Sequence, residues 1–127
     1  MKPLHWFFFA LIVVLLGIFA LKGQKSFEYS FSEEAQLGQA HLKVAIIQKE
    51  EDLVRGFSYH KEIQADEGLL FVFNSPNRYG IWMKDMNFAL DIIWLNEKKE
   101  IVSIRENFSR ESYPEVAYPD ANSTFVL

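Results

Sequence analysis

The chain has 127 residues, a formal net charge of −4 and no cysteine. This length suits one domain, and the missing cysteine excludes a disulfide, a thiol nucleophile, a Cys-ligated metal and a lipoprotein-type anchor. Residues 1–21 carry a single charge, Lys2, so the rest of the chain sets 12 Lys and Arg against 17 Asp and Glu, a net charge of −5. An acidic domain without a basic cluster repels phosphate backbones, so we expect no nucleic-acid partner.

The N-terminal segment is apolar over the length of a membrane span. Every residue from Trp6 to Leu21 is apolar or glycine, and residues 4–21 would form a helix of about 27 Å, close to the thickness of a hydrocarbon core. A cleaved signal has a shorter apolar stretch followed by small residues, whereas here the bulky Ile18 precedes Ala20. We therefore expect residues 1–21 to be a retained signal-anchor helix in the bilayer. A cleaved signal, which would release a secreted domain, is the alternative.

The charges that flank this segment do not decide its orientation in the bilayer. Lys2 precedes the apolar run, and Lys22 and Lys25 follow it, so the positive-inside rule leaves the reverse orientation open. The short N-terminal tail favours export of the domain. We expect the domain on the extracytoplasmic face, periplasmic or outer, after a linker at residues 22–26.

Residues 27–127 have the pattern of a β domain. Alternating apolar and polar residues predict strands at 27–31, 41–48 and 100–105, and further strands are expected at 79–83 and 124–127. The runs 69–73 and 90–95 are apolar on both faces, which predicts central strands covered on both sides. Residues 49–55 form one short helix stopped by Gly56, and 32–39, 59–67 and 107–122 are expected loops. Many short strands between turns indicate an all-β sandwich or barrel.

A series of motifs from about residue 40 to 127 resembles domain-of-unknown-function family 192, an uncharacterised family. The motifs are Leu42–Ala45, Arg55-Gly56-Phe57-Ser58, Gly68-Leu69-Leu70-Phe71-Val72-Phe73, Ile81-Trp82-Met83-Lys84, Leu90-Asp91-Ile92-Ile93-Trp94, Ile101–Ile104 and Phe125-Val126-Leu127. The resemblance implies a small, usually exported, jelly-roll-like β fold and no known activity. Phe57-Ser58 departs from the family's usual Leu-Met.

The family pattern continues past the last strand of this chain with Glu-Leu and a glycine-bearing turn. The sequence ends at Leu127, so we expect a copy truncated at its C-terminus or lacking its final sheet edge. A neighbouring strand would then keep unpaired N–H and C=O groups, which invite pairing with another chain.

Asp91 is the most informative polar residue in the apolar strands. Alternation places it on one face with Ile93 and Leu95, where an ionised carboxylate is costly unless paired. We expect it to be buried and paired with Arg55 or Lys84. The alternative is an acid/base or ligand-orienting carboxylate.

Trp82 and Lys84 should point to the same side of their strand, opposite Ile81 and Met83. They could line a pocket, with the indole as a platform and the ammonium group as an anion contact. The alternative is a core tryptophan and an edge lysine that limits aggregation. The candidate binding residues are therefore Arg55, Trp82, Lys84 and Asp91.

The sequence gives little support for a metal site, a serine nucleophile or a phosphate-binding loop. His41 and His60 lie in no metal-binding spacing, no serine lies in a Gly-x-Ser-x-Gly elbow, and there is no phosphate-binding glycine loop. We expect no metal and no cofactor, and assign no catalytic residue. The chain is predicted to be a membrane-anchored extracytoplasmic β domain that binds a small ligand or an envelope protein. The alternative is a small hydrolase or lyase that uses Asp91 with Lys84 or Arg55.

The anchor generates the first prediction. Because residues 4–21 should lie in the bilayer, we expect the protein to stay in the membrane fraction after an alkaline carbonate wash. A soluble protein whose N-terminus maps near Lys22 would show instead that the segment is cleaved.

Overall fold

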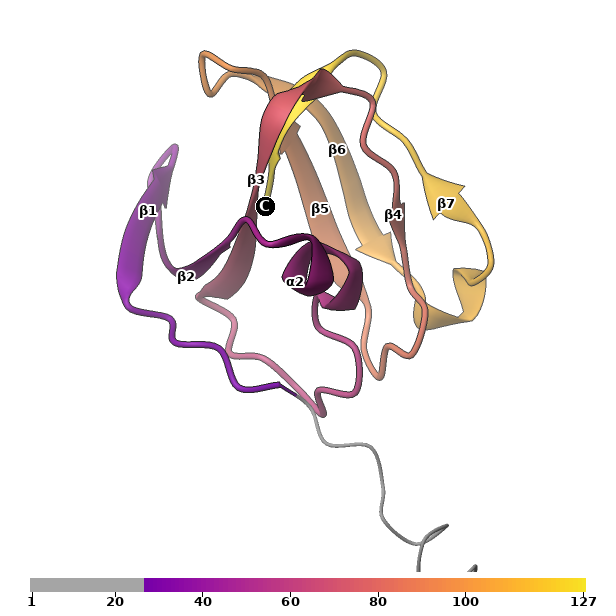
Figure 1. Cartoon of the computed structure of the whole chain (residues 1–127). Coiled ribbons are helices and arrows are strands. Elements are labelled where there is room, and N and C mark those ends of the chain that lie inside the picture. The colour runs from indigo at the N-terminus through magenta and orange to yellow at the C-terminus, as the bar shows by residue number, and fades with distance from the viewer. Residues whose placement is uncertain (1–26) are drawn as a thin grey trace, which may run out of the picture.

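The computed structural model describes residues 27–127, which form a mostly β domain with one short α-helix (Figure 1). The expectation of an all-β domain with one helix is confirmed. Its elements are β1 (Glu33–Leu37), β2 (Ala40–Ile47), α2 (Glu50–Arg55), β3 (Glu67–Asn77), β4 (Ile81–Trp82), β5 (Leu90–Leu95), β6 (Ile101–Phe108), the 3₁₀ turn η1 (Arg110–Ser112), β7 (Val116–Ala117) and β8 (Ser123–Val126).

Six of the strands form one mixed sheet in the order β1-β2-β3-β8-β5-β6, and β4 pairs with β7 in a separate ribbon. β2 and β3 are parallel, connected through α2, and the other neighbours are antiparallel. The last strand is therefore internal, between β3 and β5. The edges of the described sheet are β1 and β6.

The apolar strands lie where the sequence predicts. Residues 69–73 fall inside β3, which is central as expected, and β5 has the predicted bounds. Ile92 and Trp94 are buried, as expected for central strands. Phe71 and Phe73 are only half-buried. The two phenylalanines line a cavity rather than a closed core.

Three sequence expectations are wrong. Residues 27–31 are no strand, because Tyr29 and Phe31 pack against the ring of Phe57 instead of pairing in a ladder. Residues 33–37, an expected loop, form β1, because Gly38 adopts a left-handed φ of 60° and closes a hairpin with β2. Residues 107–122, also an expected loop, contain η1 and β7.

The strand expected at residues 79–83 is shortened to the two residues of β4. β7 packs closely over its start. A Cβ on Gly80 would lie 2.5 Å from Cγ1 of Val116, so only glycine allows this approach.

Two apolar clusters hold the layers together. One joins β5, β6 and β8 to the β4–β7 ribbon and contains the buried Met83, Ile92, Trp94, Phe108, Ala117 and Val126. The other joins β2 and β3 to the segment after α2 and contains Ala45, Ile47, Phe57 and Leu69. Because Trp94 Nε1 also donates to Tyr79 O at 2.8 Å, its polar atom is satisfied inside the core.

The membrane-helix expectation for residues 1–21 and the linker at 22–26 fall outside the described residues. Within residues 27–127, no helix combines the length and apolar character needed to cross a membrane.

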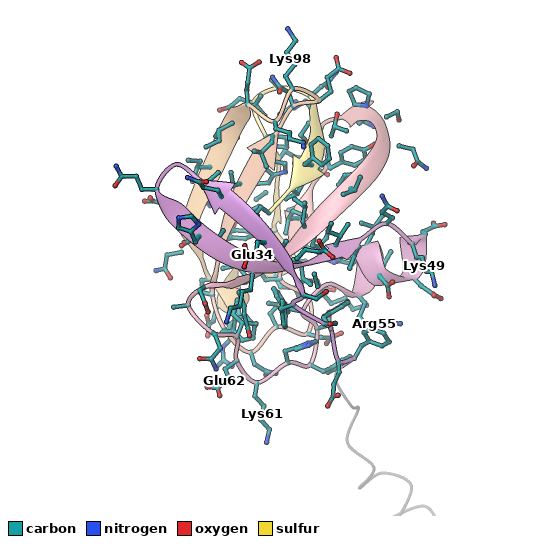
Figure 2. The ribbon with its side chains drawn as sticks, turned by 90° about the vertical axis from the view of Figure 1, so that its left-hand side faces the viewer. Glu34, Lys49, Arg55, Lys61, Glu62 and Lys98 are labelled. Carbon is teal, nitrogen blue, oxygen red and sulfur yellow. The ribbon has the colours of Figure 1, made fainter. Side chains whose placement is uncertain are left out.

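The basic residues are dispersed over the described surface. Figure 2 shows Lys49, Lys61 and Lys98 pointing away from the domain from three separate places.

Truncation of a core side chain and truncation of a side chain in the cavity wall should lower the free energy of unfolding by different amounts. Trp94 is 1% exposed, so Trp94→Ala should lower the free energy of unfolding by about 3–5 kcal/mol. Phe71→Ala, at a half-buried cavity wall, should cost only about 1–2 kcal/mol. Urea unfolding of both variants checks this order, and equal losses would contradict the cavity assignment of Phe71.

Candidate functional site

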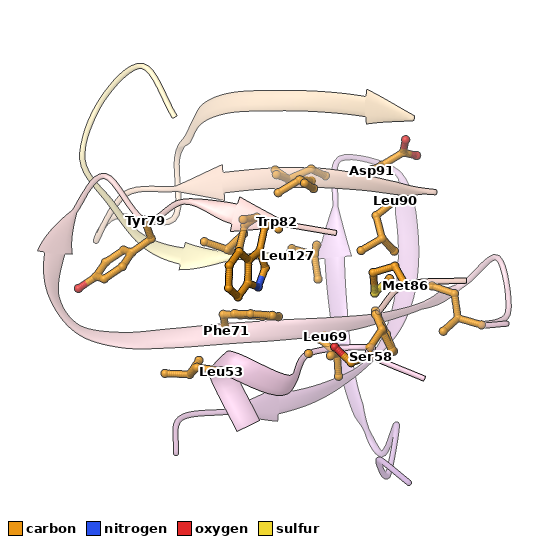
Figure 3. Close-up of a pocket in the computed structure, with 18 of the residues that line it drawn as sticks. Leu53, Ser58, Leu69, Phe71, Tyr79, Trp82, Met86, Leu90, Asp91 and Leu127 are labelled. Carbon is orange, nitrogen blue, oxygen red and sulfur yellow. The ribbon is translucent and has the colours of Figure 1, made fainter. Parts of the chain in front are cut away.

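A cavity of about 830 Å³ lies between β3, β5, α2 and β4. Its wall is mainly apolar, and Figure 3 labels ten of its residues: Leu53, Ser58, Leu69, Phe71, Tyr79, Trp82, Met86, Leu90, Asp91 and Leu127. Its volume lies within the range of about 300–1,000 Å³ that small-molecule pockets occupy. This cavity is the candidate functional site.

The four residues proposed from the sequence, Arg55, Trp82, Lys84 and Asp91, all lie in the wall of this cavity. They do not form one cluster, however. No ion pair among residues 27–127 joins Asp91 to Arg55 or Lys84. Lys84 Nζ lies over the Trp82 ring at 5.6 Å, the single direct contact found within this set.

Arg55 is engaged at the end of α2. Its Nη1 forms an ion pair with Asp52 Oδ1 at 2.9 Å, and its guanidinium carbon lies 4.5 Å from the ring centre of Phe27. The nearby Tyr29 hydroxyl donates to Gly56 O at 2.9 Å, and burial raises its pKa. Arg55 therefore fixes the helix end and its aromatic neighbours.

Trp82 and Lys84 form the polar rim of the cavity. Trp82 is 43% exposed, whereas Met83 is buried, so the predicted alternation along this segment is confirmed. The alternative of a core tryptophan is wrong, because Met83 takes the inward position beside Ile81. The ring of Tyr113 meets Trp82 edge-on at 5.7 Å. The rim thus offers an aromatic surface with an ammonium group on it.

The backbone around Lys84 is held by the loop that follows α2. Tyr59 and Asp85 both adopt left-handed backbone, with φ of 65° and 58°. Tyr59 N–H donates to Asp85 O at 2.9 Å, and Ser58 Oγ donates to Lys84 O at 3.1 Å. Non-glycine residues rarely adopt this conformation unless their surroundings impose it, so these two loops fix each other.

Side-chain contacts strengthen the same junction. The Tyr59 hydroxyl donates to Asp85 Oδ2 at 3.0 Å, and this bond raises the pKa of Tyr59. Asn87 Nδ2 donates to His60 O at 2.8 Å. The ammonium group of Lys84 is therefore carried on a backbone tied down at four points.

Asp91 is exposed, so the expectation of a buried carboxylate paired with a cation is wrong. Its Oδ1 accepts the backbone N–H of Asn107 at 2.8 Å. Asn107 has a φ of 48°, at a bulge where β6 carries an extra residue opposite Leu90 and Ile92. Asp91 lies near the start of β5, where solvent rather than core covers its side chain.

Sequence reasoning missed most of the apolar wall. The sequence pattern predicts core positions or no particular role for five residues that line the cavity: Leu53, Leu69, Phe71, Met86 and Leu90. The available signal was the excess of apolar residues on both faces of β3. Residues that line an apolar cavity and residues that pack in a core give the same pattern of apolar positions in a sequence.

The described residues offer no metal centre. No group of three His, Cys, Asp or Glu side chains within residues 27–127 is arranged to hold a metal ion. His60 stacks on Tyr29 at 5.7 Å and is half-buried.

The position of Asp91 gives a stability prediction. Asp91→Asn keeps an oxygen that can accept the Asn107 N–H, so the free energy of unfolding should change by less than about 0.5 kcal/mol. Asp91→Ala removes the acceptor and should cost about 0.5–1.5 kcal/mol. Denaturant titration at neutral pH measures both. A loss of several kcal/mol for Asp91→Asn would restore the buried-pair interpretation.

Two solved structures share the fold of this domain. A candidate transcription regulator from Sinorhizobium meliloti 1021 superposes with a TM-score of 0.64 at 23% identity, covering 68% of this chain and 66% of its own, just under two thirds. A protein of unknown function from Novosphingobium aromaticivorans DSM 12444 superposes with a TM-score of 0.65 at 15% identity, covering 84% and 81%. Identities this low establish the fold alone.

No curated protein matches the chain. The family model DUF192, described as an uncharacterized ACR, matches residues 32–127. These residues include every strand of the domain and all four proposed site residues. The resemblance seen in the sequence motifs is thereby confirmed, and the chain belongs to domain-of-unknown-function family 192.

Proposed function

We propose that this chain is a membrane-anchored extracytoplasmic binding module of the cell envelope, with a jelly-roll-like β domain. Residues 4–21 supply the anchor in the bilayer, and the domain at residues 27–127 holds a small ligand or part of a neighbouring envelope protein. The observation that carries the proposal is the cavity of about 830 Å³ with an apolar wall.

The rim of the cavity favours an occupant with an apolar body and an anionic or hydrogen-bonding end. The apolar wall would bury the body of the occupant, which is the main source of affinity in such sites. Trp82 offers an exposed ring, and Lys84 places its ammonium group 5.6 Å from that ring. The fixed loop backbone beneath Lys84 reduces the entropy lost on binding.

Nothing in the geometry favours the hydrolase or lyase alternative. That alternative needs Asp91 and a cation to act together on one reacting group. The Asp91 carboxylate instead accepts a backbone N–H from β6, and Arg55 pairs with Asp52. The arrangement supplies a surface for binding without an evident nucleophile.

A fluorescent apolar anion tests the proposal directly. With anilinonaphthalene sulfonate and the full chain in lipid nanodiscs, we expect saturable binding at one site and quenching of Trp82 emission. The Trp82→Phe variant gives the contribution of the other tryptophans. Lys84→Gln should weaken binding by about two- to fivefold, as expected for one exposed charge contact.

Lys98→Gln is the matched control, because Lys98 lies at the β5–β6 hairpin and outside the cavity wall. Its affinity for the probe should equal that of the unmodified chain. Binding that never saturates, or equal effects of Lys84→Gln and Lys98→Gln, would contradict a site at this cavity.

A further inference from the structure

One end of the domain is built from three segments that are distant in the sequence: residues 27–30, 55–62 and 84–88. The ring of Tyr29 stacks on that of His60 at 5.7 Å and so joins the first segment to the second. The second segment is joined to the third by the backbone and side-chain hydrogen bonds described above for the junction around Lys84. We call these three segments the base.

The base includes the point at which the domain joins residues 22–26. The ring of Phe27 meets that of Tyr29 edge-on at 5.1 Å, and the guanidinium carbon of Arg55 lies 4.5 Å from the centre of the Phe27 ring. The hydroxyl of Tyr29 donates in turn to Gly56 O at 2.9 Å. The joining point is therefore fixed to the rest of the base.

The connection between this point and the proposed anchor is short. The anchor ends at Leu21, and six Cα–Cα steps separate Leu21 from Phe27. An extended chain covers at most about 3.6 Å in each step, so the connection spans no more than about 22 Å. A domain of this size is about 30 Å across. The opposite end of the domain cannot turn to the bilayer, because the connection would then have to run past the whole domain.

The exposed side chains of the base suit the headgroup layer of a bilayer. Phe27 and Tyr59 are 47% and 38% exposed, and Lys61 is also exposed. Aromatic rings are enriched at membrane–water interfaces. A lysine in this position lays its methylene groups on apolar surface and keeps its ammonium group among the polar headgroups.

Charge distinguishes the base from the rest of the domain. Residues 27–127 carry 10 Lys and Arg against 17 Asp and Glu, a net charge of −7, which an anionic lipid surface repels. The base itself is balanced, and residues 22–26 add two lysines next to it. Its charged residues are Arg55, Lys61 and Lys84 against Glu28, Glu62 and Asp85. An anionic headgroup layer therefore attracts this end and repels the remainder of the domain.

We propose that the base docks on the surface of the bilayer, with the rings of Phe27 and Tyr59 among the lipid headgroups. This inference rests on the anchor of the proposed function and adds the surface through which the domain meets the membrane. The segments of the base are already fixed to one another, so docking orders few groups and loses little conformational entropy.

Fluorescence quenching by lipid headgroups tests the proposal on the full chain, with one chain in each nanodisc of phosphatidylcholine and phosphatidylglycerol. The chain has no cysteine, so Lys61→Cys and Lys98→Cys each accept a single bimane label. Figure 2 shows these two lysines at opposite ends of the domain. With a nitroxide quencher on the phosphatidylcholine headgroup, we expect the label on Lys61→Cys to lose most of its emission and the label on Lys98→Cys to keep it.

A second pair of variants tests whether the surface of the base holds the domain on the lipid. Phe27→Ser, added to the labelled Lys61→Cys chain, should lower the ratio of quenched to unquenched label about fivefold, the effect of removing half a phenylalanine ring from the headgroup layer. Ile104→Ser is the matched control, because Ile104 is 54% exposed on β6 and lies outside the base. Its quenching should be unchanged, and urea unfolding shows that both variants are folded.

The other outcomes contradict the inference in distinguishable ways. If the chain is retained in the nanodisc but both labels keep their emission, the docking inference is wrong and the anchored binding module stands. Equal quenching of both labels would mean that neither end is preferred, which overturns the inference. Equal quenching in Phe27→Ser and Ile104→Ser would show that the short connection alone brings the label to the lipid, which also overturns it. A chain that does not enter nanodiscs would contradict the anchor, and both proposals would then be wrong.

Discussion

The structure depends on the pairing of one short strand, β8, with two neighbours at once. β8 is the strand that connects the β1–β2–β3 half of the main sheet with the β5–β6 half. At its centre, Val126 lies opposite both Phe71 and Trp94, and its side chain is buried in the core cluster. Backbone pairing and apolar burial act at the same residue, so loss of β8 would separate the halves and open the core between them.

The cavity follows from this arrangement. Where β8 lies between them, β3 and β5 are held at ladder distance by hydrogen bonds on both sides. Side chains from these two strands, among them Leu69, Phe71 and Leu90, line the cavity. Phe71 lies opposite Val126 of β8 yet is only half-buried, because its ring lies in the cavity wall.

The sequence predicts the helix and the two most apolar strands, β3 and β5, because their signals are local. Runs of residues that are apolar on both faces identify β3 and β5. Gly56 ends α2 where the sequence predicts. The order of the strands could not be read in the same way, because nothing local in Ser123–Val126 specifies insertion between β3 and β5. Asp91 illustrates the same limit. Its exposure depends on whether another layer covers its face of the strand, and the strand pattern does not contain this information.

The two roles considered for Asp91, structural and functional, are compatible at the level of its atoms. A carboxylate has two oxygens, each able to accept more than one hydrogen bond. Oδ1 accepts from Asn107 and stabilises the left-handed residue of the β6 bulge, while no bond to Oδ2 occurs among the described residues. The side chain is exposed and lies in the cavity wall. The bond to Asn107 holds the carboxylate in place, so less side-chain entropy is lost when a cation binds at the exposed Oδ2.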